Sequence, residues 1–171
     1  MGPRGAGHFV CAVTLSIVAA GAAPARESIA ELQARFDREP DSVRKAKLLQ
    51  KLGDAQFEQA RREGEAGKYD AATKLFEAYR DNARTALEGL KKTRPNAERH
   101  SGGYRQLQIH VHKAERVLHE TILGAPDEWR APLEQIRQEL DKMEEELIRL
   151  LFPRRPGEKP LPTAPKASPP K

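Results

Sequence analysis

Apolar residues recur every three or four positions along most of the chain, which is the spacing of one face of an α-helix. The pattern runs from residue 28 to residue 152, with breaks that contain glycine or proline. It predicts one short helix and four long ones, at 28–38, 42–66, 69–92, 103–123 and 127–152. Long helices of matched length with short connections favour antiparallel neighbours. We therefore expect an all-α domain of long helical hairpins, arranged as a four-helix bundle or as two stacked hairpins.

Residues that start and stop helices stand where this pattern begins and ends. Ser28, with Glu31 three residues later, forms the capping box that opens a helix. Pro95 ends a helix because proline lacks the backbone N–H that a further turn needs. Gly67 follows the predicted helix 42–66 directly. We expect it to adopt the left-handed conformation that is common just past a helix end.

One short segment also fits a strand. Residues 106–112 alternate between polar and apolar side chains, as a half-buried strand does. The sequence offers no partner strand, and an unpaired strand leaves its backbone hydrogen bonds unmade. We therefore assign this segment to the helix 103–123.

Part of the second and third predicted helices resembles the tetratricopeptide helical hairpin. The residues that carry the resemblance are Leu52-Gly53, Gly67-x-Tyr69-x-x-Ala72 and Phe76. In that family such residues let two helices pack closely. The chain departs from the family because its Leu-Gly pair lies about two helical turns further from the Gly-x-Tyr turn, and Arg84 stands near the family's terminal proline. The resemblance implies a single elongated hairpin. As a whole, the chain also resembles small exported helical proteins of uncharacterised function.

The N-terminus has the features of a secretory signal peptide. Arg4 precedes an apolar run over residues 9–20, and small residues follow. The run is too short to span a membrane, which takes about 20 residues. We expect residues 1–25 to form a Sec-type signal that is cleaved after Ala22 or Ala25, and the protein to be periplasmic or extracellular. An uncleaved N-terminal anchor is the alternative. The single cysteine lies in the apolar run, so the mature chain has no cysteine chemistry.

Positive charge is concentrated outside the helical part. The chain has a formal net charge of +5, whereas residues 28–152 contain 23 basic and 23 acidic side chains. A nucleic-acid-binding protein needs a basic face on its folded part, so we expect no nucleic-acid partner. Residues 153–171 are rich in proline and lysine and bury no apolar surface, so we expect a disordered tail. Its charge allows a weak contact with an anionic envelope surface.

The candidate chemistry is sparse. The sequence contains no Gly-rich phosphate loop, no Ser-His-Asp arrangement and no His-Glu-x-x-His motif, so we expect no enzyme and no cofactor. The candidate metal ligands follow one helix at spacings of three and seven residues: His112, Glu115 and His119. The candidate interaction surface consists of large aromatic residues: Tyr69, Phe76, Tyr79, Tyr104 and Trp129.

Three functions follow as hypotheses. The first is an exported, non-enzymatic helical protein that mediates protein–protein interaction or scaffolding, through an unidentified protein partner or through self-association. The second is a structural bundle that its basic tail holds electrostatically to the cell envelope. The third is a bundle that binds a metal ion or a small ligand. The apolar stripe from Leu133 to Leu151 bears on the first, because an exposed stripe of that length marks an interaction surface.

Overall fold

The computed structural model describes residues 27–153, which form five α-helices and no strand. The helices are α1 (Ile29–Arg38), α2 (Ser42–Glu65), α3 (Tyr69–Thr93), α4 (Ser101–Gly124) and α5 (Asp127–Leu151). The all-α prediction is confirmed, and every helix end falls within two residues of its expected position. The predicted signal peptide and all but the first residue of the tail lie outside the described residues. No helix in residues 27–153 has the length and hydropathy of a membrane span.

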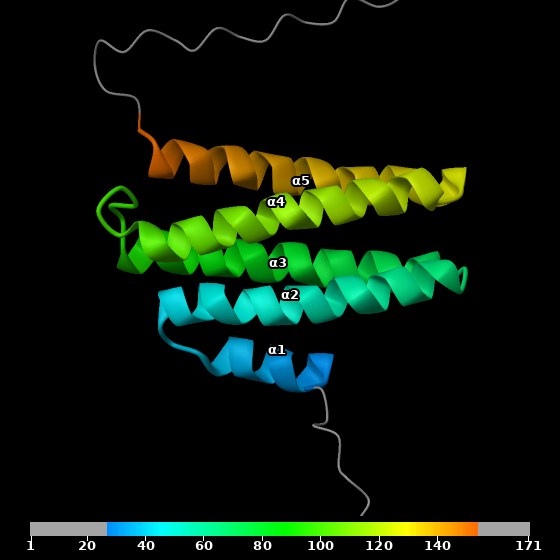
Figure 1. Ribbon diagram of the computed structural model, residues 1–171, viewed down its shortest axis with the longest axis horizontal. Coiled ribbons are helices and arrows are strands. Elements are labelled where there is room, and N and C mark those ends of the chain that lie inside the picture. Colours follow the sequence, from blue (N-terminus) through cyan, green and yellow to red (C-terminus); the bar gives the residue numbers. More distant parts are fainter. Residues whose placement is uncertain (1–26, 154–171) are drawn as a thin grey trace, which may run out of the picture.

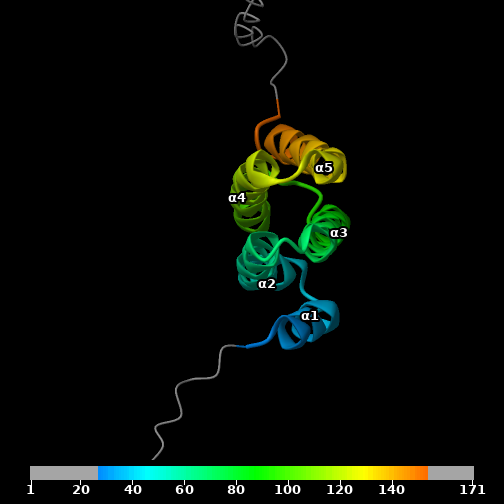
Figure 2. The ribbon, with the colours of Figure 1, turned by 90° about the vertical axis from the view of Figure 1, so that its right-hand side faces the viewer.

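The four long helices form a bundle, and α1 packs on its outside (Figure 1). An end-on view places α2, α3, α5 and α4 in that order around the bundle (Figure 2). Hydrogen bonds join Gln50 to Gln106 and Asp54 to His110, and the partners in both pairs are 56 positions apart in the sequence. This constant offset means that α2 and α4 run in the same direction. The fold therefore consists of two antiparallel hairpins, α2–α3 and α4–α5, stacked side by side.

The core runs the length of the bundle. On α5 the six buried apolar residues are all 6% exposed or less: Leu133, Ile136, Leu140, Met143, Leu147 and Leu151. The other helices of the same chain cover this stripe, so the bundle needs no second copy to bury it. The stripe is therefore not an interaction surface.

The short helix α1 covers the seam between α2 and α3. Its capping box forms as expected, with the backbone of Glu31 donating to the Ser28 side chain. Phe36 is 1% exposed and lies under the ammonium group of Lys45, 5.0 Å from the ring centre. The amide groups of Gln33 and Asn82 exchange two hydrogen bonds, at 3.0 and 2.8 Å. Apolar and polar contacts together fix α1 on the first hairpin.

The turn between α2 and α3 is built around Gly67, which has a φ of +73°. Its N–H donates to the carbonyl of Gly64 at 2.9 Å, and the N–H of Lys68 donates to that of Glu63 at 2.8 Å. This pair of bonds is the Schellman motif, which satisfies carbonyls at a helix end and needs a left-handed residue. The expectation for Gly67 is confirmed.

Replacing Gly67 with alanine should test this turn. We expect Gly67→Ala to lower the free energy of unfolding by about 1 kcal/mol, because a Cβ atom disfavours positive φ. Gly102→Ala is the matched control: a Cβ at either position meets no atom within 4 Å, but only Gly67 has a positive φ. Denaturant titration followed by circular dichroism measures both variants. Equal stability of the two variants would contradict the role given to Gly67.

Candidate functional site

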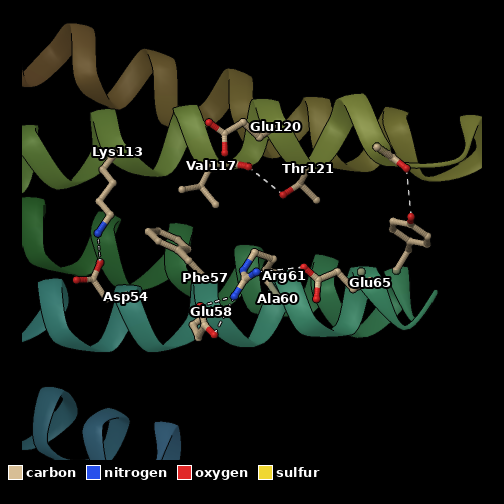
Figure 3. A pocket seen from close by; sticks show the side chains of 13 residues that line it. Asp54, Phe57, Glu58, Ala60, Arg61, Glu65, Lys113, Val117, Glu120 and Thr121 are labelled. Atoms are coloured by element: carbon tan, nitrogen blue, oxygen red, sulfur yellow. Dashed lines mark hydrogen bonds and ion pairs between the residues drawn. The ribbon is translucent and has the colours of Figure 1, made fainter.

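An open groove of about 660 Å³ lies between α2 and α4 (Figure 3). Its floor consists of Phe57 and Ala60 from α2 and Val117 from α4. Phe57 and Ala60 belong to the core, whereas Val117 is partly exposed. Tyr69, at the start of α3, closes one end and donates from its hydroxyl to the carbonyl of Gly124 at 3.2 Å. The groove has the size of a ligand pocket, for which 300–1,000 Å³ is usual.

Missing side-chain volume keeps the groove open. Gly64 and Gly124 line it, and Ala60 contributes a single methyl group to its floor. A Cβ atom added at Gly64 would meet only the Tyr69 ring, at 3.9 Å, and one at Gly124 would meet nothing within 4 Å. The space is therefore available to side chains of another molecule.

Charged side chains form the rim of the groove. Arg61 binds Glu58 and Glu65 on its own helix, both at 3.1 Å. Glu120 has no ion pair within residues 27–153. Together with Asp54, the rim holds four carboxylates against the two cations Arg61 and Lys113, a net charge of −2. An acidic rim around an apolar floor favours an apolar group with positive charges beside it.

A chain of hydrogen bonds runs behind the floor, from buried Tyr79 to Asp54 on the rim. The Tyr79 hydroxyl lies 2.9 Å from His110 Nδ1, and His110 Nε2 lies 3.0 Å from Asp54 Oδ1. Because the Asp54 carboxylate only accepts, Nε2 carries the proton and Nδ1 accepts from the hydroxyl. Lys113 donates to the same Asp54 oxygen at 2.7 Å. Phe57 stacks on the His110 ring, with centroids 5.6 Å apart.

The environment of this chain sets its protonation. Burial lowers the pKa of His110, although Asp54 acts in the opposite direction. The lowered pKa keeps the imidazole neutral. Burial would raise the pKa of Asp54, but hydrogen bonds from Lys113 and His110 outweigh it and lower that pKa. Burial raises the pKa of Tyr79 far above its usual value. Tyr79 is fully buried, so its hydroxyl does not reach a substrate, and the chain of bonds joins helices.

The absence of a side chain at Gly53 makes this contact possible. A Cβ atom there would lie 2.5 Å from Cε1 of His110 and 2.7 Å from Cε2 of Tyr79. Both distances are well inside van der Waals contact. The Leu-Gly pair of α2 therefore lets a tyrosine from α3 and a histidine from α4 meet against the α2 backbone.

The five aromatic residues expected at an interaction surface lie in different environments. Tyr69 lines the groove, and Trp129 is partly buried against the core. Phe76, Tyr79 and Tyr104 are 0% exposed, so their assignment to a surface is wrong. These rings are buried because alanine occupies many core positions of this bundle, and larger side chains are needed to fill the remaining core volume.

The expected metal ligands are brought together only in part. His112 and Glu115 lie close together, but Glu144 of α5 joins them instead of His119. Seven residues of helix separate His112 from His119 by about 10 Å, which is too far for one ion. The expected place of His119 in the cluster is therefore wrong. Burial, followed by the charge of Glu144, raises the pKa of Glu115 to about 8.

Several residues of the groove have no local signal in the sequence. Phe57, Val117 and the charged rim come together only because α2 and α4 are parallel, and no local pattern encodes that pairing. His110 gave the one available signal, since it occupies an apolar position between Leu107 and Val111 of α4. A histidine at such a position indicates a buried polar contact.

Comparison of the chain with protein-family models, with curated proteins and with solved structures found no match.

Substitution of Gly53 should disrupt the contact behind the groove. We expect Gly53→Ala to lower the free energy of unfolding by about 1 to 3 kcal/mol, because the methyl group forces two packed rings to move. Gly89→Ala, near the C-terminal end of α3, is the control. A Cβ there meets Ser42 Cβ at an ordinary 3.6 Å, so stability should hold or rise slightly. Urea titration compares the two, and a stable Gly53→Ala variant would show that the rings are not closely packed.

Removing the Tyr79 hydroxyl should reveal the value of the buried hydrogen bond. Tyr79→Phe leaves His110 Nδ1 without a donor, and we expect a loss of about 1 to 3 kcal/mol of unfolding free energy. Tyr69→Phe is the matched control, because its hydroxyl bonds at the surface, where water replaces it. Thermal and urea unfolding measure both. Losses of the same size in the two variants would argue against a special role for the buried pair.

Proposed function

We propose that this chain is an exported, non-enzymatic helical protein that binds another protein through the groove between α2 and α4. The observation that carries the proposal is the groove itself, with its apolar floor of Phe57, Ala60 and Val117 and its charged rim. The resemblance of the α2–α3 segment to a tetratricopeptide hairpin supports it, because such hairpins present grooves to peptides. The proposal of export rests on residues 1–25, which lie outside the described part of the chain.

The chemistry of the groove defines the partner. Its floor accepts apolar side chains, and its acidic rim favours basic ones beside them. An amphipathic helix or extended segment with an apolar anchor and flanking lysine or arginine meets both requirements. Glu120 is the rim carboxylate that no cation engages within residues 27–153, so it is the first candidate to pair with such a segment.

The groove is preorganised for binding. The bond chain from Tyr79 through His110 to Asp54 fixes α4 against the first hairpin just behind the floor. The α5 stripe is covered within the same chain. Binding therefore requires no refolding of the bundle, and a preorganised surface spends less free energy on ordering than a flexible one.

The proposal can be tested by selecting binders of the purified chain from a displayed peptide library. Half of its amphipathic peptides carry basic flanking residues, and the other half carry acidic ones. We expect basic peptides with apolar anchors to be selected and to bind saturably by calorimetry. Gly64→Leu fills the groove from a position where a new side chain meets only the Tyr69 ring, and it should weaken binding by about tenfold or more. Glu120→Lys should weaken it as well, with a loss that shrinks at high salt.

The control is Gly102→Leu, which adds the same side chain in open space at the start of α4. Its affinity should equal that of the unaltered chain, and circular dichroism verifies that all variants fold. A library that yields no saturable binder would sink the proposal. So would peptides that bind Gly64→Leu as tightly as the unaltered protein.

A further inference from the structure

Three side chains with metal-binding atoms meet on the side of α4 that faces α5. His112 and Glu115 are three residues apart on α4, so both leave the same face of that helix. Glu144 reaches them from α5. One ligand atom from each of the three lies within 4.8 Å of the other two. The cluster therefore bridges two helices with an imidazole and two carboxylates.

The separation of these atoms suits a small divalent ion. His112 Nδ1 lies 3.2 Å from Glu144 Oε2. Two ligands at about 2.0 Å from a tetrahedral Zn²⁺ ion are about 3.3 Å apart. The imidazole and this carboxylate already have that spacing, and an atom of Glu115 lies within 4.8 Å of both.

One oxygen of Glu115, Oε1, is buried without a hydrogen-bond donor in the described part of the chain. Burial, the charge of Glu144 and a hydrogen bond to it raise the pKa of Glu115, so Glu115 holds a proton beside Glu144 at neutral pH. The nearby guanidinium of Arg137 is held by both carboxylate oxygens of Glu134 on its own helix. A divalent cation would displace this proton and bind the carboxylate oxygens of Glu115 and Glu144.

An outer contact already orients one of the ligands. Gln108 Nε2 donates to Glu144 Oε1 at 2.7 Å. This bond holds the Glu144 carboxylate with both of its oxygens 3.2 Å from His112 Nδ1. Metal sites commonly use such outer hydrogen bonds to fix the direction of a ligating carboxylate.

We propose that His112, Glu115 and Glu144 bind a divalent transition-metal ion of the Zn²⁺ type that joins α4 to α5. The imidazole nitrogen favours such an ion over Mg²⁺ and Ca²⁺, which prefer oxygen ligands throughout. The two carboxylates balance its charge. Three protein ligands leave one tetrahedral position for water. The side chain of His112 is 69% exposed, so the ion enters from solvent.

Metal titration of the full chain, prepared without a histidine tag and dialysed against a chelator, tests this site. We expect calorimetry to show one Zn²⁺ bound per chain, and thermal unfolding to shift upward with added Zn²⁺, because an ion that binds only the folded state stabilises it. Glu144→Gln and His112→Ala should each weaken binding by about tenfold or more. Both variants keep the fold, since His112 is exposed and glutamine has the shape of glutamate.

Two controls separate this site from general surface binding. His119→Ala removes an exposed histidine from the same helix, and Glu145→Gln removes the exposed carboxylate next to Glu144. Both should bind Zn²⁺ with the affinity of the unaltered chain. Absence of saturable binding to the unaltered chain overturns the proposal. Equal binding by Glu144→Gln, by His112→Ala and by the controls also overturns it, because the ion then lies elsewhere.

Discussion

The rest of the structure depends on the close approach of three helices at Gly53. The missing side chain lets Tyr79 from α3 and His110 from α4 pack against the α2 backbone, and Asp54 completes their hydrogen bonds. Apolar contacts alone tolerate slippage between helices, whereas a buried donor without its acceptor is costly. The polar contact therefore selects one register of the second hairpin against the first. It also fixes the register of α2 against its parallel neighbour α4, on which the groove depends.

The position of α4 along its axis determines the geometry of both the groove and the His112 cluster. His110 points toward α2 and α3, and two positions later His112 faces α5, because two residues turn a helix by about 200°. The face that carries His110 continues to Lys113 and Val117 in the groove. The face that carries His112 continues to Glu115 beside α5. A shift of α4 along its axis would disturb the groove and the ligand cluster together, so the buried contact behind Phe57 positions side chains on both sides of the helix.

Sequence reasoning succeeded where the signal is local. Helical periodicity, the capping box at Ser28 and the left-handed turn at Gly67 each depend on a few neighbouring residues, and all three appear in the structure. The sites depend on contacts between helices that are 30 to 60 positions apart, such as Tyr79 with His110. No period encodes which faces will meet. For that reason helical periodicity alone does not assign Phe76, Tyr79 and Tyr104 to the core, and it does not group Glu144 with His112.

The distribution of small and large side chains along the helices explains why this bundle has a groove. Close approach of the helices requires small residues, and the chain supplies them at Gly53 and at Gly103, where a Cβ atom would lie 2.7 Å from Leu90. Toward the other end of α2 small residues continue, at Ala60 and Gly64, but no large side chain from α4 comes in to fill the space. The same residue type therefore produces tight packing at one end and an open groove at the other. The side chain on the facing helix decides which of the two results. His110 and Leu90 fill the space at Gly53 and Gly103, whereas Val117 is too short to fill the groove.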